Sequence, residues 1–404
     1  MIKIRNLFKS GKNRFRSILF LAFISSLLFS VPGCENNPND LGLSYISPLD
    51  TLNKKVLNSR IDTMLITSTN TLKYINTSTS QNLFVGKYQN YESRGLLKFT
   101  YFPSGYDTFT VVSAKLKIRY NKNYFKDSLG VTSFNIYKLN RYVDLSQVTY
   151  DSITSSDIGN TSLGTYSGTP VDTSLITIPF NTQIISEWIK SANDTSVYKN
   201  YGVIFMPDFN STTIKSFYST ASITGDFGPI IMLVLTNGTK TDTVSLNLSS
   251  TTSISDAPTS IIPNERILLQ SGLSYRGSLK FDLSKLPSNV IINEAYLEFK
   301  YDPANSFFLS NSSDKRIAFS LLTDTTLQNS DNLFYYASLI DSVTYSVRLN
   351  SIFQRWNSGT AVNYGVQLKN VNDVTGFDKI ALYSPLASDV SKRPYLRIFY
   401  TIRN

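Results

Sequence analysis

One short stretch occurs twice in the chain. Residues 94–99 read Arg-Gly-Leu-Leu-Lys-Phe, and residues 276–281, offset by 182 positions, read Arg-Gly-Ser-Leu-Lys-Phe. A matching segment follows each of them, at residues 114–120 and 295–301. This repeat is far longer than the period of about 20–50 residues found in solenoids and propellers. It therefore indicates two copies of one globular domain.

Four further landmarks occur in both halves. They are a Trp, an Asn-Tyr-Gly-Val segment, a Tyr-Ser pair and a final segment that begins at a Pro: Trp188 and Trp356, 200–203 and 363–366, 218–219 and 383–384, 229–235 and 394–400. We place the first copy at residues 58–238 and the second copy at residues 239–404.

The landmark segments alternate with a period of two. In the first copy Leu97 and Phe99 share one face of a strand, and Arg94, Leu96 and Lys98 share the other. The composition agrees, because Tyr and Phe number 25 each against 4 Met, and aromatic residues suit pleated surfaces. We therefore expect an all-β protein with two tandem β-sandwich domains of jelly-roll type.

The absence of His and the single Cys exclude whole classes of site. Catalytic triads, Cys/His dyads and His- or Cys-ligated metal sites need an imidazole or several thiolates. Asp and Glu total 29 and form no recognisable acid–base motif. We therefore expect neither an enzyme nor a cofactor, and a polysaccharide lyase is the remaining catalytic alternative.

The N-terminus has the pattern of a lipoprotein signal peptide. Residues 1–16 are basic, residues 17–31 are mostly apolar, and Val-Pro-Gly leads into Cys34. This ending resembles a lipobox, so we assign residues 1–33 to the signal and the lipid anchor to Cys34. The alternative is an ordinary secretory signal in which Cys34 is incidental.

Residues 34–57 are predicted to be the lipidated Cys and a tether. The start of this segment is rich in Asn and acidic residues and resembles the export signals of surface lipoproteins in some Gram-negative bacteria. We therefore expect a protein that is lipid-anchored at the outer membrane or cell surface of a Gram-negative bacterium.

The formal net charge of +10 does not indicate nucleic-acid binding. Six basic residues and no acidic residue precede Cys34, so the mature chain carries a net charge of +4. Spread over two domains, this is a weak field without the basic stripe that duplex binding needs. It is compatible with an anionic ligand.

The longer motif of the second copy resembles a known family. Residues 276–287, residues 295–299, Trp356, residues 363–366 and the Arg-Pro-Tyr-Leu at 393–396 resemble the DNRLRE-domain family. Its members are extracellular β-sandwich domains related to disaggregatases and to a carbohydrate-binding module family that recognises alginate. The resemblance is looser in the first copy. It implies a shared fold for both copies and a glycan ligand mainly for the second.

The two landmark strands supply the candidate glycan-binding residues. Cations on their outward faces could meet uronate carboxylates and the neighbouring Tyr rings could stack on sugars: Arg94, Lys98 and Tyr91 in the first copy, and Arg276, Lys280 and Tyr275 in the second. The plainer alternative, which we favour for the Arg residues, is that each Arg pairs with a nearby carboxylate. For any one Tyr the corresponding alternative is a core or cross-strand residue.

Trp188 and Trp356 are expected in the core, because apolar residues flank both. The segment 184–189 around the first Trp fits either one helical turn or a strand. Oxygen-bearing residues that follow the Tyr-Gly segments are expected to be turn formers, with a structural Ca²⁺ as the alternative: Asp208, Asn210, Asn370, Asn372 and Asp373.

These patterns predict a surface-anchored lipoprotein whose two non-catalytic modules bind polysaccharide, best an anionic one. The first alternative is a structural spacer or adhesion lipoprotein that binds protein partners. The second is a polysaccharide lyase. The membrane would be bound through Cys34, and no nucleic-acid partner is expected.

Overall fold

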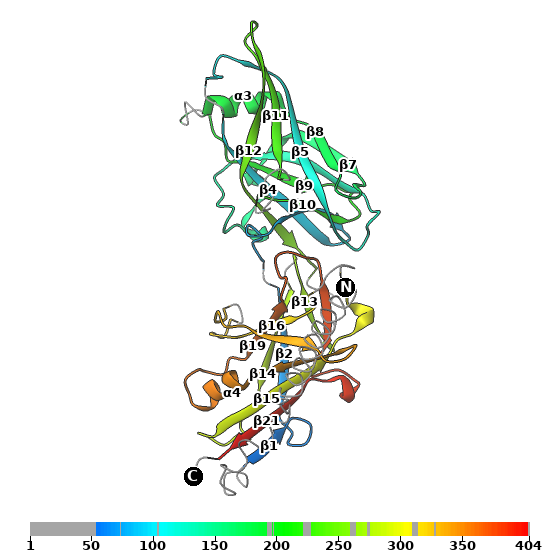
Figure 1. The fold of residues 1–404 in the computed structure, drawn as a ribbon, viewed down its shortest axis with the longest axis vertical. Helices are drawn as coiled ribbons and strands as arrows, with labels where there is room; N and C mark the ends of the chain where they lie inside the picture. Colours follow the sequence, from blue (N-terminus) through cyan, green and yellow to red (C-terminus); the bar gives the residue numbers. More distant parts are fainter. Residues whose placement is uncertain are drawn as a thin grey trace, which may run out of the picture. The chain divides into compact units, whose positions relative to one another are not determined.

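The computed structural model describes residues 54–402 apart from residues 73, 103–104, 192–195, 197, 221–227, 259–263, 273–274, 309–313 and 327–328. Within them the chain consists mainly of antiparallel strands, so the all-β prediction is confirmed. The strands form two sandwiches (Figure 1). The predicted signal peptide, Cys34 and residues 35–53 of the predicted tether lie outside the described residues.

The first sandwich contains ten strands in the order β12-β11-β5-β10-β3-β4-β9-β6-β7, with β8 paired to β5. Its elements are β3 (Asn82–Tyr88), β4 (Tyr91–Tyr101), β5 (Thr110–Phe125), β6 (Thr132–Leu139), η1 (Tyr150–Ser152), η2 (Ser155–Asp157), β7 (Ile158–Gly168), β8 (Leu175–Pro179), α3 (Thr182–Ser191), β9 (Val203–Pro207), β10 (Ile214–Tyr218), β11 (Ile230–Thr236) and β12 (Thr241–Asp256).

The second sandwich repeats this plan in the order β1-β21-β15-β18-β17-β16-β19-β14-β2, with β13 and β20 as a separate pair. Its elements are β1 (Lys54–Asn58), β2 (Ile66–Leu72), β13 (Arg266–Gln270), β14 (Tyr275–Phe281), β15 (Ile291–Lys300), η4 (Pro303–Asn305), β16 (Ile317–Leu321), β17 (Tyr335–Leu339), β18 (Thr344–Arg348), α4 (Asn350–Asn357), β19 (Val366–Asn370), β20 (Lys379–Tyr383), η5 (Val390–Lys392) and β21 (Tyr395–Thr401).

The repeated Asn-Tyr-Gly-Val segment joins two strands of each sandwich in the same way. The Asn200 side-chain amide donates to the Phe99 carbonyl at 2.5 Å, and the Asn363 amide donates to the Phe281 carbonyl at 2.8 Å. The following glycine has φ +96° in the first copy (Gly202) and +102° in the second (Gly365), and a Cβ there would overlap the carbonyl of the facing strand. In both copies the motif therefore allows the strand that follows it to pack closely against the facing strand of the sheet.

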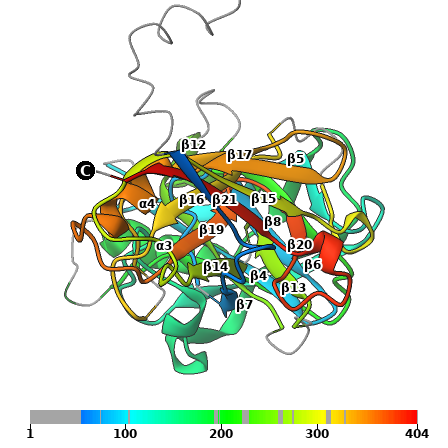
Figure 2. The same ribbon diagram turned by 90° about the horizontal axis from the view of Figure 1, so that it is seen from below.

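The two copies exchange the strands that close their sandwiches. β12 precedes β13 in the chain, as β1 and β2 precede β3. Nevertheless β12 pairs with β11 and β4 of the first sandwich, whereas β1 pairs with β21 and β2 pairs with β14 of the second. Figure 1 shows the blue strands β1 and β2 in the sandwich that also contains the red strand β21, and Figure 2 shows the molecule from the end at which this sandwich lies. Strands that precede the first copy thus complete the second sandwich, and the strand that precedes the second copy completes the first sandwich.

The predicted bounds of the first copy, residues 58 and 238, are therefore both wrong. The second sandwich is discontinuous, since it takes β1 and β2 from residues 54–72 and all its other strands from residues 266–401. The first sandwich extends to residue 256 through β12. Residues 237–240, where the boundary was placed, form only the hairpin turn between β11 and β12, in which the Asn237 N–H donates to the Lys240 carbonyl.

Each sandwich has its own hydrophobic core, and each core contains one Trp. Trp188 on α3 packs with Phe99 and Phe180, and Trp356 on α4 packs with Phe281 and Phe353. Both indoles are buried, so the prediction of core Trp residues is confirmed. The segment 184–189 is helical; it lies in α3, whose Ile184 N–H is capped by the Asn181 side chain at 3.0 Å.

Candidate functional site

The outward face of β4 in the first sandwich is apolar and covered. Leu96 on β4, Ile204 on β9 and Ile254 on β12 pack against residues of the β6–β7 connection. This connection, residues 140–157, contributes Val143, Leu145, Val148 and Ile153 to the same buried cluster. It is held in place because the Asn76 amide donates to the carbonyls of Leu145 and Val148 at 2.9 and 2.8 Å. We call this connection the cap.

The equivalent face of the second sandwich is polar. Leu96 stands between Thr252 and Ile204 in its sheet, and Ser278 stands between Thr69 and Gln367. The position opposite the landmark Arg is Ile254 in the first copy and Thr71 in the second. Three apolar side chains of the first face thus correspond to three polar ones: Ser278, Gln367 and Thr71. We call the surface formed by β2, β14 and β19 the polar face.

A cavity of about 200 Å³ lies on the polar face. It is lined by hydroxyls, one cation and one aromatic ring: Thr67, Thr69, Ser278, Lys280, Thr325 and Tyr364. This volume is below the 300–1,000 Å³ or so that encloses a drug-sized ligand. It suits a shallow contact with one unit of a polymer.

Lys280 is the exposed cation of this cavity. It lies opposite Thr67 in the β2–β14 ladder, and its ammonium forms no ion pair with a described carboxylate. Its counterpart Lys98 is half-buried, and the Lys98 ammonium lies 4.9 Å from the centre of the Tyr142 ring in the cap. Of these two predicted cations, Lys280 is therefore the one that a ligand can approach.

The two predicted Arg residues are held by protein partners, as the plainer alternative had it. Arg94 donates to Glu92 at 2.6 Å and to the Tyr150 hydroxyl at 2.7 Å. Arg276 donates to Asp373 and, at 3.3 Å, to Gln367. Their side chains are only 15% and 11% exposed. Both Arg residues order the sheet face and are not free contacts for a carboxylate.

Lys369 adds a second cation to the polar face. Its ammonium lies 3.9 Å from Asp373 and 4.8 Å from the centre of the Phe334 ring. Burial lowers the pKa of Lys369; Asp373 opposes this effect and Arg276 adds to it. With Arg276, Lys280 and Lys369 against Asp373, the polar face has an excess of positive charge.

The prediction that Tyr91 and Tyr275 offer stacking platforms is wrong. Tyr275 is 2% exposed and Tyr91 is 8% exposed, and both belong to a buried cluster with Phe84, Phe125 and Phe377. Burial raises the pKa of both phenols, as expected for rings withdrawn from water. These rings are core residues.

The oxygen-bearing residues considered for Ca²⁺ have protein partners. Asp208 accepts from the Asn210 N–H and from the Ser133 hydroxyl, each at 2.8 Å. The Asn370 amide donates to Ser271 and to the Asp378 carbonyl. Asp373 accepts from Arg276, and the Asn372 carbonyl accepts from the Thr375 N–H. Over the part of the chain that the structure describes, no three His, Cys, Asp or Glu side chains gather in a way that could hold a metal ion.

Sequence reasoning missed most of the polar face. Thr67 and Thr69 lie about 210 residues before Ser278, and nothing local indicates that they pair with β14. A signal for the rest was present, because aligning the two copies sets Leu96 against Ser278 and Ile204 against Gln367. At these two positions, which are neighbours on adjacent strands, apolar residues of the first copy are replaced by polar residues of the second. This replacement identifies the face on which the two copies differ.

Comparisons with known proteins add little to this picture. No protein-family model and no curated protein matches the chain. A search of solved structures returns "Structure of the Macrobrachium rosenbergii Nodavirus", which is 11% identical over 88% of this chain and 94% of that chain, with a TM-score of 0.16. A likeness at that TM-score carries no argument. None of the helices in the described ranges is long and apolar enough to cross a membrane.

Proposed function

We propose that this protein is a non-catalytic, lipid-anchored binding protein that holds an anionic polysaccharide on the polar face of its second sandwich. The observation that carries the proposal is the contrast between equivalent faces. The first is apolar and covered by the cap, whereas the second carries Ser278, Gln367 and three threonines of β2 beside Lys280 and Tyr364. Ser278 and Gln367 are themselves buried, whereas Thr67, Thr69 and Lys280 are exposed and available to a polar ligand.

The chemistry of the polar face suits a uronate polymer. Lys280 and Lys369 attract carboxylates, the hydroxyls of Thr67 and Thr69 can exchange hydrogen bonds with sugar hydroxyls, and the Tyr364 ring offers a flat apolar surface. The lipid anchor on Cys34 and the resemblance to DNRLRE domains belong to the same proposal. The protein would thus retain polysaccharide at the cell surface.

Affinity electrophoresis tests this function. We expect migration of the protein to be retarded in gels that contain alginate or pectin and unchanged in gels that contain a neutral glucan. The retardation should weaken as salt rises above about 0.15 M, where the Debye length is about 8 Å. Lys280→Ala and Tyr364→Ala should each reduce the retardation, because both residues line the cavity.

The matched controls are the equivalent residues of the first sandwich, Lys98→Ala and Tyr201→Ala, which should migrate like the wild type. Absence of retardation in every anionic gel would leave the spacer function as the better account. A rise in ultraviolet absorbance on incubation with alginate would reveal unsaturated products and therefore a lyase.

A further inference from the structure

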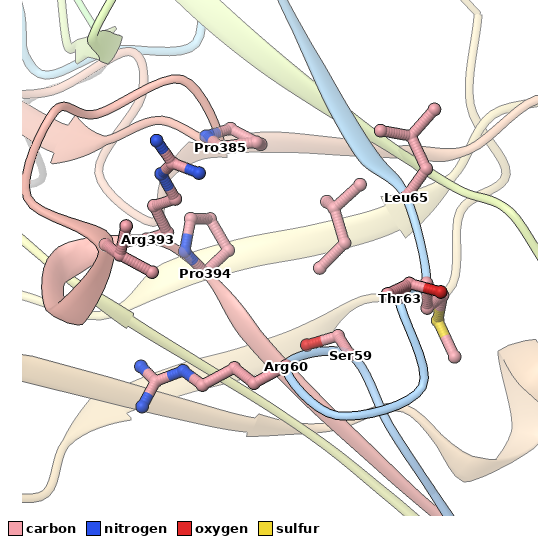
Figure 3. Close-up of a pocket in the computed structure, with 10 residues that line it drawn as sticks. Ser59, Arg60, Thr63, Leu65, Pro385, Arg393 and Pro394 are labelled. Carbon is pink, nitrogen blue, oxygen red and sulfur yellow. The ribbon is translucent and has the colours of Figure 1, made fainter.

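A second cavity lies at the connection between β1 and β2, just before the residues of β2 that belong to the polar face. It measures about 320 Å³ and lies between the β1–β2 connection and the connection that leads from β20 to β21 (Figure 3). Ser59, Arg60, Thr63 and Leu65 line it from the first connection, and Pro385, Val390, Arg393 and Pro394 line it from the second. The buried residues Met64 and Ile66 also line it.

Apolar side chains around this cavity are exposed to solvent. Leu65 and Val390 line the cavity, and Ile61 and Leu386 are the chain neighbours of the lining residues Arg60 and Pro385. Each of these four side chains is more than half exposed. Large exposed apolar residues on the two connections that border one cavity are of the kind that marks an interaction site.

The rim of the cavity is cationic. Neither Arg60 nor Arg393 forms an ion pair with a described carboxylate: Arg60 lies over the Tyr395 ring at 4.4 Å, and Arg393 Nε donates to the Ala387 carbonyl at 2.7 Å. In Figure 3 both guanidinium groups lie on the side opposite Leu65 and Thr63. The nearby carboxylates are engaged locally, because Asp62 accepts from the Asn58 N–H and Asp389 pairs with Lys392.

We propose that this surface, formed by Ile61, Leu65, Leu386 and Val390 with Arg60 and Arg393, docks the second sandwich onto a bilayer with anionic headgroups. We call it the docking patch. The proposal rests on the lipid anchor of the proposed function. The apolar side chains enter the boundary between headgroups and acyl chains, and the two guanidinium groups contact phosphates.

The length of the chain favours a membrane as the occupant. β1 begins at Lys54, 20 residues after Cys34, so even a fully extended segment spans at most about 70 Å. The docking patch follows β1 directly, and the exposed Lys54 and Lys55 at the start of β1 add positive charge to this segment. An anchored patch meets the membrane at a high effective concentration, so weak intrinsic affinity suffices.

Sedimentation with vesicles tests the docking patch without relying on acylation. The protein is the chain that begins at residue 35, which keeps every described residue and lacks the lipid. We expect it to sediment with vesicles of phosphatidylcholine containing about one-third phosphatidylglycerol and to stay in solution with phosphatidylcholine alone. Arg60→Gln with Arg393→Gln should weaken this binding about 25-fold, and Leu65→Ser with Val390→Ser should weaken it about tenfold or more.

Matched controls remove the same kinds of side chain from the first sandwich. Lys115→Gln with Lys117→Gln removes two outward cations of β5, and Leu129→Ser with Phe209→Ser removes two exposed apolar side chains. Both pairs should bind vesicles like the wild type. The melting temperature of each variant is measured to show that it is folded.

Three results would overturn the docking proposal: no binding to anionic vesicles, undiminished binding by the patch variants, or sedimentation equilibrium showing a dimer that the patch variants disrupt. The last result would assign the surface to a second copy of the chain. Failure here is distinguishable from failure of the proposed function, because alginate binding by the patch variants and acylation of Cys34 are read in separate assays.

Discussion

Replacing Ile66 by Ala should destabilise the second sandwich, although Ile66 lies within the range predicted for the first copy. Ile66 is 7% exposed, lies opposite Phe281 in the β2–β14 ladder and belongs to the core of the second sandwich. Truncating a buried Ile to Ala costs about 2–5 kcal/mol. Since each kcal/mol lowers the melting temperature of a domain of this size by about 2–4 °C, we expect a decrease of about 4–20 °C.

The chain contains its own reporters for this experiment, because Trp188 lies in the first core and Trp356 in the second. In a Trp188→Phe background the fluorescence follows the second sandwich, and in a Trp356→Phe background it follows the first. Ile66→Ala should lower the Trp356 transition and spare the Trp188 transition. The shift is measured within each background, so the cost of the Trp replacement cancels.

Leu246→Ala is the matched control. Leu246 lies on β12 within the range predicted for the second copy, yet it is fully buried in the core of the first sandwich. It should lower the Trp188 transition and spare the Trp356 transition. If Ile66→Ala instead lowers the Trp188 transition alone, the exchange of strands is refuted and the division at residue 238 is restored.

The remaining predictions concern the anchor, the repeated motif and the charge of the polar face. Cys34→Ser should abolish labelling of this protein in cells that are fed a clickable palmitate, and undiminished labelling would refute the lipoprotein assignment. Gly365→Ala should lower the free energy of unfolding by about 2 kcal/mol or more, because a Cβ at φ +102° meets the Leu279 carbonyl, whereas Gly359→Ala at φ +73° has nothing within 4 Å and should cost about half as much in chemical denaturation. The pKa of Lys369 is lowered from the ordinary Lys value of about 10.4. Its ammonium is therefore fully present at neutral pH and is lost as pH rises through the lowered pKa. Alginate affinity, measured by calorimetric titration, should therefore fall as pH rises toward about 10, and Lys369→Arg should retain it; an affinity that does not change with pH would remove Lys369 from the site.

Much of the fold could be predicted from local pattern. The period-two alternation placed Leu97 and Phe99 on one face of a strand, and that face lies in the first core. The position of Trp188 among Ile residues indicated burial, which is confirmed. The Asn-Tyr-Gly-Val repeat was visible in the sequence, and the structure gives its Asn and Gly a hydrogen-bonding and a steric reason in both copies. These features depend on neighbours that are close in sequence or repeated.

The exchange of closing strands could not be predicted in this way. Whether Ile66 faces Phe281 or the equivalent Phe99 depends on which sandwich the chain enters first, and both choices satisfy the same alternation. The burial of Tyr91 and Tyr275 has a similar cause, because their cluster combines side chains from both sandwiches. The contrast between Leu96 and Ser278 was visible in the aligned copies, but its meaning required the cap to be located.

Lysine footprinting tests the polar face most directly. Exposed lysines of the chain that begins at residue 35 are acetylated with and without an alginate oligosaccharide, and the modified positions are read by mass spectrometry. The polar face predicts that the oligosaccharide protects Lys280 and Lys369 and leaves Lys98 and Lys115 as reactive as before. Protection at Lys98, or binding that leaves both Lys280 and Lys369 unprotected, would contradict the assignment of the site to the second sandwich.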